Sequence, residues 1–347
     1  MLTDTLLSNT TNLMETLYFL GIDISKKKFD AALTIDGKQF HEAQIENTPA
    51  AIQLFFRDLK KQLSSLNRLT VCLEHTGIYC LPLLNFLVKH KIRVSVEPAL
   101  QIKQSQGMTR GKNDQADAKR IALYALKNCE NLRFWQPQRH CIQRLKALLV
   151  LRERMVKMKV QLEVPLHESR EFVATSIFKQ TLANCQKTIR ALQSDIKGIE
   201  KEIDTLVSND EQISQQCRIA TSVPGVGKIT ALNMIISTQE FSRIQDAKKF
   251  ACYAGVAPFE HSSGSSIRGK TRVSKMANMT LKKLLHLAAM SAIQCNDELR
   301  IFYKRKVDSG KNKMSVMNAV RNKLISRIFA CIKDKRIYQK VYQHALV

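Results

Sequence analysis

The chain has 347 residues, with 55 Lys and Arg against 30 Asp and Glu, and carries a formal net charge of +25. This length predicts two or three folding units, and a hydrophobic fraction of 44% argues against wholesale disorder. No run approaches the roughly 18 consecutive apolar residues of a membrane span, and the first fifteen residues lack the basic start of a signal peptide. The positive charge points to a polyanionic partner, most commonly nucleic acid, although a nonspecific basic surface has the same composition.

The positive charge is concentrated near the C-terminus. Residues 265–347 hold 19 Lys and Arg and four acids, a net charge of +15. We therefore expect this segment to make most of the phosphate contacts. Nine cysteines are scattered without any C-x-x-C pair, which favours reduced thiols of a cytoplasmic protein over a disulfide framework or a zinc cluster.

After a flexible leader, residues 1–15, the pattern of residues 16–135 predicts an α/β domain. Three strands are expected first, around the basic turn Ser25–Lys28 and a second turn at Asp36-Gly37. Helices and strands then alternate. The expected elements are strands within 16–35 and 38–46, a helix from Pro49, a strand at 69–76, a helix at 79–90, a strand at 93–99 and a helix at 112–128. This order matches the ribonuclease-H-like arrangement.

Residues 136–215 are predicted to form a helical coiled-coil region. Apolar residues recur there at alternating spacings of three and four: Ile189, Leu192, Ile196, Ile199, Ile203 and Leu206. Pro165 is expected to mark the start of a hairpin tip between two antiparallel helices. A hairpin packed within one chain and a coiled coil between chains are both compatible with this pattern.

Residues 216–335 are predicted to form a mainly helical C-terminal domain, followed by a tail, 336–347. The segment SVPGVGKITA (222–231) has the pattern of a helix-hairpin-helix unit. Its turn and the following helix N-terminus, with Gly225, Gly227 and Lys228, could bind a phosphate.

Four carboxylates have the spacing of a metal site. Asp23 and Glu74 lie in apolar strands, where a carboxylate is costly to bury without a cation or a strong donor. Asp114 and Asp117 lie three residues apart on one helix face, although they could also be ordinary N-terminal helix acids. If these elements converge, the cluster needs divalent cations to neutralise it, and its oxygen ligands suit Mg²⁺, with Mn²⁺ as a substitute.

The segment 258–275 places four serines around Gly264 and follows them with Arg268, Lys270, Arg272 and Lys275. A serine beside several cations could attack a phosphodiester, because the cations would stabilise the developing oxyanion. From chemistry alone, a surface loop that merely binds phosphate is the favoured interpretation.

Five motifs in order resemble the DEDD transposases of bacterial insertion sequences, the Piv/MooV-like group. Three of them carry the acids and two belong to a C-terminal transposase domain: GIDISKKKFD (21–30), CLEHTGIY (72–79), RGKNDQADAKRIA (110–122), SVPGVGKITA (222–231) and APFEHSSGSSIRGKTRVSKMANMTLKKLL (257–285). The resemblance runs from about residue 17 to 330.

The resemblance implies a RuvC-like N-terminal domain, a coiled-coil linker and a C-terminal domain with a nucleophilic serine. When the family's motif positions are transferred to this sequence, the acidic tetrad is Asp23, Glu74, Asp114 and Asp117, and the serine immediately before the glycine is Ser263. It also implies double-stranded donor and target DNA and a guide RNA from the element's own non-coding end. We further expect a homo-oligomer (dimer or tetramer), because the heptad seam could pair protomers, and a bacterial, nucleoid-associated location in the cytoplasm, away from membranes.

We therefore predict a Mg²⁺-dependent, RNA-guided transposase that cuts and rejoins DNA through a covalent phosphoserine intermediate. Two alternatives differ in chemistry. One is a Holliday-junction nuclease that uses the carboxylates to activate water, and the other is a nucleic-acid-binding protein without catalytic activity.

Overall fold

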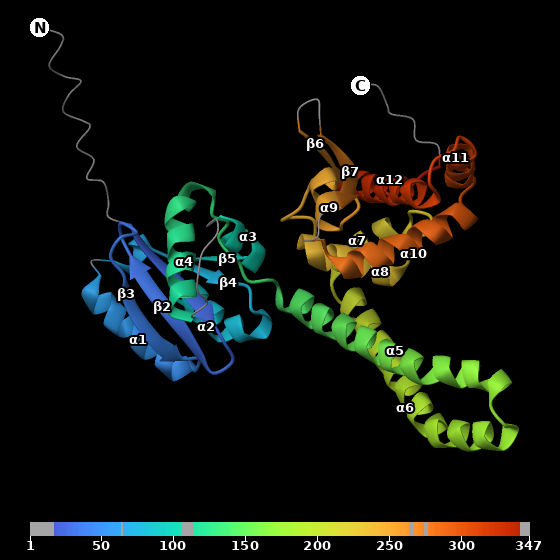
Figure 1. Cartoon of the computed structure of the whole chain (residues 1–347), viewed down its shortest axis with the longest axis horizontal. Coiled ribbons are helices and arrows are strands. Elements are labelled where there is room, and N and C mark those ends of the chain that lie inside the picture. Colours follow the sequence, from blue (N-terminus) through green and yellow to red (C-terminus); the bar gives the residue numbers. More distant parts are fainter. Residues whose placement is uncertain (1–16, 64, 106–113, 264–266, 274–276, 341–347) are drawn as a thin grey trace, which may run out of the picture. The chain divides into compact units, whose positions relative to one another are not determined.

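The computed structural model describes residues 17–63, 65–105, 114–263, 267–273 and 277–340, without the side chains of 114–115 and 259–272. The chain divides into two compact units, Met1–Pro137 and Gln138–Val347 (Figure 1). The predicted α/β N-terminal domain and mainly helical remainder are confirmed. The predicted boundary between residues 135 and 136 lies two residues before the division after Pro137, and the boundary between 215 and 216 lies within the second unit; both stay predictions.

The first unit contains a five-stranded sheet. Its strands are β1 (Tyr18–Ile24), β2 (Lys28–Thr34), β3 (His41–Glu46), β4 (Leu69–Glu74) and β5 (Arg93–Glu97). They lie in the order β3-β2-β1-β4-β5. β2 runs antiparallel to β1 and β3, whereas β4 is parallel to β1 and β5 is parallel to β4. The order and directions match the expected ribonuclease-H-like arrangement.

Helices cover this sheet, and alternate residues of each central strand face opposite sides. The helices are α1 (Pro49–Gln62), α2 (Leu81–Lys89), α3 (Ala99–Gln104) and α4 (Asp114–Lys127). Leu20 and Ile22 of β1 share one core with α1 and α2. Phe19 of β1 and Cys72 of β4 share another with Ile121 of α4. The face that carries Phe19 and Cys72 is called the α4 face below.

The beginning of α1 follows directly from its sequence. Thr48 caps the helix, since its side chain accepts a hydrogen bond from the Ala51 N–H at 3.3 Å, and Pro49 occupies the first helical position, where no N–H is needed. The sequence pattern did not predict α3, because this helix has only six residues.

Gly21 lets α4 lie directly against β1. A Cβ atom at Gly21 would lie 2.2 Å from both the Ala118 carbonyl oxygen and the Ala122 nitrogen. Both atoms belong to the helix backbone, so a side chain could not be accommodated by a rotamer change. The absence of a side chain at Gly21 therefore sets the distance between helix and sheet.

The second unit contains the long helices and a two-stranded antiparallel ribbon. Its elements are α5 (His140–Phe172), α6 (Thr175–Ser208), α7 (Glu211–Thr221), α8 (Lys228–Thr238), α9 (Ala247–Tyr253), β6 (Pro258–Ser263), β7 (Ile267–Val273), α10 (Met279–Cys295), α11 (Asp297–Asp308) and α12 (Lys313–Lys333). No described helix is long and apolar enough to cross a bilayer.

Helices α5 and α6 form an antiparallel hairpin within the chain (Figure 1). Leu145, Ile199 and Ile203 belong to the same buried core, so part of the predicted heptad seam packs against α5. The expected hairpin tip at Pro165 is wrong. α5 continues through Pro165 to Phe172, and the turn lies at Val173 and Ala174, because one missing backbone donor does not end a helix whose other bonds and packing persist.

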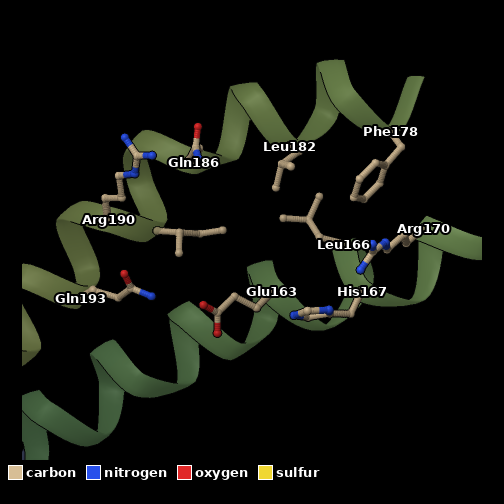
Figure 2. Close-up of a pocket in the computed structure, with 10 residues that line it drawn as sticks. Glu163, Leu166, His167, Arg170, Phe178, Leu182, Gln186, Arg190 and Gln193 are labelled. Carbon is tan, nitrogen blue, oxygen red and sulfur yellow. The ribbon is translucent and has the colours of Figure 1, made fainter. Parts of the chain in front are cut away.

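Towards the tip the two helices enclose a cavity of about 500 Å³ (Figure 2). Its apolar lining includes Leu166 of α5 and Phe178 and Leu182 of α6, and polar side chains such as Glu163 and Gln193 also line it. The hairpin is thus less tightly packed near its tip than at its base.

We predict that Gly21→Ala destabilises the first unit, because its Cβ would overlap backbone atoms of α4. Overpacking typically costs about 1–3 kcal/mol, and the 2.2 Å approach places this substitution at the upper end or beyond. Urea denaturation measures the change. Gly198→Ala in α6 is the control, since no atom lies within 4 Å of its added Cβ and alanine favours helix by up to about 1 kcal/mol. Equal or greater stability of Gly21→Ala would contradict the packing account.

Candidate functional site

Asp23 and Glu74 lie at the carboxyl ends of two neighbouring parallel strands. The register pairs Ile22 of β1 with Leu73 of β4, so the next residues along the strands, Asp23 and Glu74, come level with each other. Asp23 is two residues from Gly21, and Glu74 is two residues from Cys72, so both belong to the α4 face. Since neighbouring strands lie about 4.8 Å apart, the fold brings these two predicted site residues together.

Two further carboxylates, which the sequence analysis did not single out, lie at the same level of the sheet. Asp23 pairs with Asp30 of β2, and Glu74 pairs with Glu97 of β5. Directly paired residues share a face, so one row of acids crosses four strands. Both Asp30 and Glu97 are buried. A charged residue within or ending an apolar strand was the signal that could have identified them.

The outer two acids of this row have polar partners on the sheet. Gln44 donates a hydrogen bond to Asp30 at 2.8 Å, and the Lys28 ammonium lies 3.5 Å from the other carboxylate oxygen. The Ser95 hydroxyl donates to Glu97 at 2.5 Å. These contacts compensate for part of the cost of burying the two carboxylates.

Burial and the negative charge of Glu97 raise the pKa values of two side chains in the core of the α4 face. Burial, with the nearby negative charge of Glu97 as a second cause, raises the pKa of the Cys72 thiol well above its usual range. The same two causes raise the pKa of Tyr124. Cys72 therefore stays protonated and unreactive at neutral pH.

Asp117 lies in the first turns of α4, the helix that packs on this face. Its carboxylate accepts a hydrogen bond from Arg120 at 2.6 Å and is about one third exposed. The side chain of Asp114 lies outside the described residues. Among the residues that the structure does describe, no group of three or more His, Cys, Asp or Glu side chains is close enough to hold a metal ion.

The donor chemistry of Asp23 and Glu74 nevertheless fits a divalent cation. Carboxylate oxygens are hard ligands of the kind that Mg²⁺ and Mn²⁺ prefer. Asp117 would have to exchange its bond with Arg120 for a bond to the cation. Asp23 and Glu74 are therefore the two members of the predicted tetrad that the strand backbones hold level with each other.

The predicted helix-hairpin-helix unit corresponds to α7, the turn 222–227 and α8. Gly225 has φ +84°, and a Cβ there would lie 2.5 Å from the Ala288 carbonyl oxygen of α10. Gly225 therefore has a packing role. Lys228 forms an ion pair with Asp204 of α6, and both side chains are substantially exposed. Such an exposed pair is weak and leaves Lys228 available to exchange partners.

The segment predicted as a serine loop is mostly a β-ribbon. Ser263 is the last residue of β6 and pairs with Ile267 of β7, while Ser262 pairs with Arg268. The pairing is irregular between Phe259 and His261. Lys270 and Arg272 also belong to β7, whereas Gly264, Ser265, Ser266 and Lys275 lie outside the described residues. The ribbon places Ser263 at the end furthest from the helices that anchor it.

Two family models match this chain. A DEDD-type transposase model of the IS110 group matches residues 20–169, which include the acidic strands and α4. A model described as a transposase of the IS116/IS110/IS902 family matches residues 217–304, which include the hairpin between α7 and α8 and the serine ribbon.

Curated relatives extend over nearly the whole chain. The pilin gene-inverting protein of Moraxella bovis is 27% identical over 326 residues, which cover 93% of this chain and 98% of the relative. A transposase for insertion sequence element IS1111A of Coxiella burnetii is 26% identical over 258 residues, covering 66% and 68% of the two chains.

Among solved structures, RuvC of Thermus thermophilus in complex with a Holliday junction substrate matches 34% of this chain and 99% of its own, with 12% identity and a TM-score of 0.28. The two family models account for both units, and the relatives align across them. The chain therefore belongs to the DEDD transposases of the IS116/IS110/IS902 family, which are DNA transposases and recombinases.

Proposed function

We propose that this transposase cuts and rejoins DNA through a covalent bond to Ser263, with Asp23, Glu74, Asp114 and Asp117 as its acidic tetrad. The observation that carries the proposal is the pair of carboxylates, Asp23 and Glu74, level on neighbouring parallel strands. A second feature supports it: Ser263 ends a ribbon whose other strand contains Arg268, Lys270 and Arg272.

In the proposed reaction the Ser263 oxygen attacks a DNA phosphorus atom and its proton passes to solvent. The bond from phosphorus to one deoxyribose oxygen breaks, and that oxygen leaves as a hydroxyl after taking up a proton. A hydroxyl of the partner strand then attacks the phosphoserine, which restores both the serine and a phosphodiester. Each step exchanges one phosphate ester for another, so no external energy source is needed.

The cations around the serine would bind and orient the phosphate. The positive charge of Arg268, Lys270, Arg272 and Lys275 stabilises the additional negative charge of the transition state. A divalent metal ion bound by the tetrad would polarise the phosphate oxygens. The carboxylates themselves would hold the cation, and the strand register keeps Asp23 and Glu74 level with each other.

We further propose double-stranded donor and target DNA as substrates, a guide RNA encoded by the element, and a homo-oligomer as the active form. The net charge of +25 supports nucleic-acid partners, because each neutralised phosphate contributes to affinity. Gly225, Gly227 and Lys228 at the start of α8 are proposed as additional phosphate contacts.

Ser263→Ala should abolish the covalent protein–DNA adduct while DNA affinity stays within about twofold, because the serine hydroxyl contributes the nucleophile and no charge. Denaturing gels with labelled duplex measure the adduct, and fluorescence anisotropy measures affinity. Ser262→Ala, one residue earlier on the same strand, is the matched control and should retain the adduct. An adduct that survives Ser263→Ala refutes the assignment, and cleavage without any adduct in the unchanged chain supports a water nucleophile instead.

Asp23→Asn and Glu74→Gln should each weaken Mn²⁺ binding by at least about tenfold, since each removes one charged ligand at nearly constant shape. Electron paramagnetic resonance of free Mn²⁺ reads binding directly in the full chain without DNA and independently of activity. Asp58→Asn, an exposed acid on α1, is the control and should bind like the unchanged chain. Equal Mn²⁺ affinity in all four proteins would overturn the metal assignment.

A further inference from the structure

The orientation of the serine ribbon is determined at its base, where β6 leaves the helices. Ser263 ends a six-residue strand, so it lies roughly 20 Å from the base at about 3.3 Å per residue. A tilt of about 3° at the base would therefore move Ser263 by about 1 Å. The contacts of the residues just before β6 therefore contribute to where the serine lies.

Val256 is the buried residue at this base, two positions before β6. Its N–H donates to the Ala251 carbonyl oxygen of α9 at 2.8 Å. Its carbonyl oxygen accepts a hydrogen bond from the side-chain amide of Asn318 at 2.5 Å. Asn318 belongs to α12, 62 residues further along the chain, so a side chain of a distant helix holds the start of the ribbon.

Arg321 determines which way the Asn318 amide points. It lies one turn along α12, and its guanidinium donates to the Asn318 side-chain oxygen at 3.4 Å. A guanidinium has no acceptor atom, so the oxygen end of the amide must face Arg321. The NH₂ end is thereby left facing the Val256 carbonyl.

His286 of α10 holds the other side of the guanidinium, with 2.6 Å between its Nδ1 and an Arg321 nitrogen. Because Arg321 can only donate, Nδ1 must be an acceptor and the ring must be neutral. Burial and the positive charge of Arg321 both lower the pKa of His286, in agreement with a neutral ring. The hydrogen bonds run from His286 through Arg321 and Asn318 to Val256.

Stability alone does not explain Arg321. The residue is only 5% exposed. No described Asp or Glu forms an ion pair with it, and its Nε has no hydrogen-bond partner. Burying a cation without a counter-ion is costly, because the charge loses its hydration. A residue that costs stability at a well-packed position is expected where function requires it.

We propose that Asn318 is a positioning residue for the nucleophile: oriented by Arg321 and His286, it fixes the base of the ribbon so that Ser263 meets the phosphate correctly. This inference rests on the proposed role of Ser263. A misplacement of about 1 Å can cost roughly a hundredfold in rate, so loss of the Asn318–Val256 bond should act on the chemical step and leave DNA binding intact.

Asn318→Asp tests the proposal. The carboxylate still accepts from Arg321 and supplies a counter-ion, which offsets the loss of the bond to the buried Val256 carbonyl, so the melting temperature should stay close to that of the unchanged chain. It cannot donate to the Val256 carbonyl, so the single-turnover rate of adduct formation should fall roughly 10- to 100-fold. Asn312→Asp is the matched control. Asn312 caps the N-terminus of the same helix, and asparagine and aspartate cap helices equally well. The control should match the unchanged chain in rate.

Arg321→Gln provides a second test that does not depend on the folding of Asn318→Asp. Its control is Arg327→Gln, a partly buried arginine of the same helix that pairs with Glu298 of α11. Arg321→Gln should slow adduct formation at least tenfold relative to Arg327→Gln at equal DNA affinity. The double variant with Asn318→Asp should be no slower than the slower single variant, because both act on one contact.

Equal adduct rates for Asn318→Asp and Asn312→Asp, or equal rates for the two arginine variants, overturn the positioning role. Failure of the proposed function looks different. In that case the unchanged chain forms no serine adduct at all, and every variant in the series is equally inactive.

Discussion

The contact between α4 and β1 at Gly21 is the constraint on which the first unit depends. A helix backbone that lies against a strand backbone, with no side chain between them, brings the acid-bearing start of α4 to the face that carries Asp23 and Glu74. The same face holds the buried Asp30 and Glu97. A larger residue at position 21 would separate the helix and its acids from the sheet. Gly21 thus sets how closely the start of α4 approaches the proposed acidic site.

The second unit differs from the first, because its proposed nucleophile, Ser263, lies at the end of a two-stranded ribbon. Two strands alone are marginally stable, and the rest of the unit supplies rigidity at their base. Val256 is held by α9 and by Asn318 of α12, while Asn278 at the start of α10 donates its N–H to the Tyr253 carbonyl at 2.9 Å. The long α5–α6 hairpin joins the same buried core. The helices therefore serve as a rigid frame for a small reactive element.

The residue pattern within one strand or helix was enough to predict the features that depend on that element alone. Asp23 and Glu74 could be identified because a carboxylate in an apolar strand needs a special explanation. Asp30 and Glu97 carry the same local signal, but their place beside that pair depends on strand register, which no single strand reveals. Pro165 was misinterpreted because packing maintains α5 beyond it.

The serine ribbon was expected as a loop, as its glycines, serines and basic residues lack the alternation typical of strands. The Asn318–Val256 bond joins residues too distant in sequence for any local pattern to predict.

The proposed reaction depends most on which atom of the protein attacks DNA. The most direct measurement is mass spectrometry of the nuclease-digested, trypsin-cleaved protein after reaction with a duplex that carries the element ends, with Mg²⁺ and the proposed guide RNA added. If Ser263 attacks DNA, a nucleotide should be attached to Ser263. A nucleotide on Ser262, Ser265 or Ser266, or cleaved DNA with every serine unmodified, would contradict it.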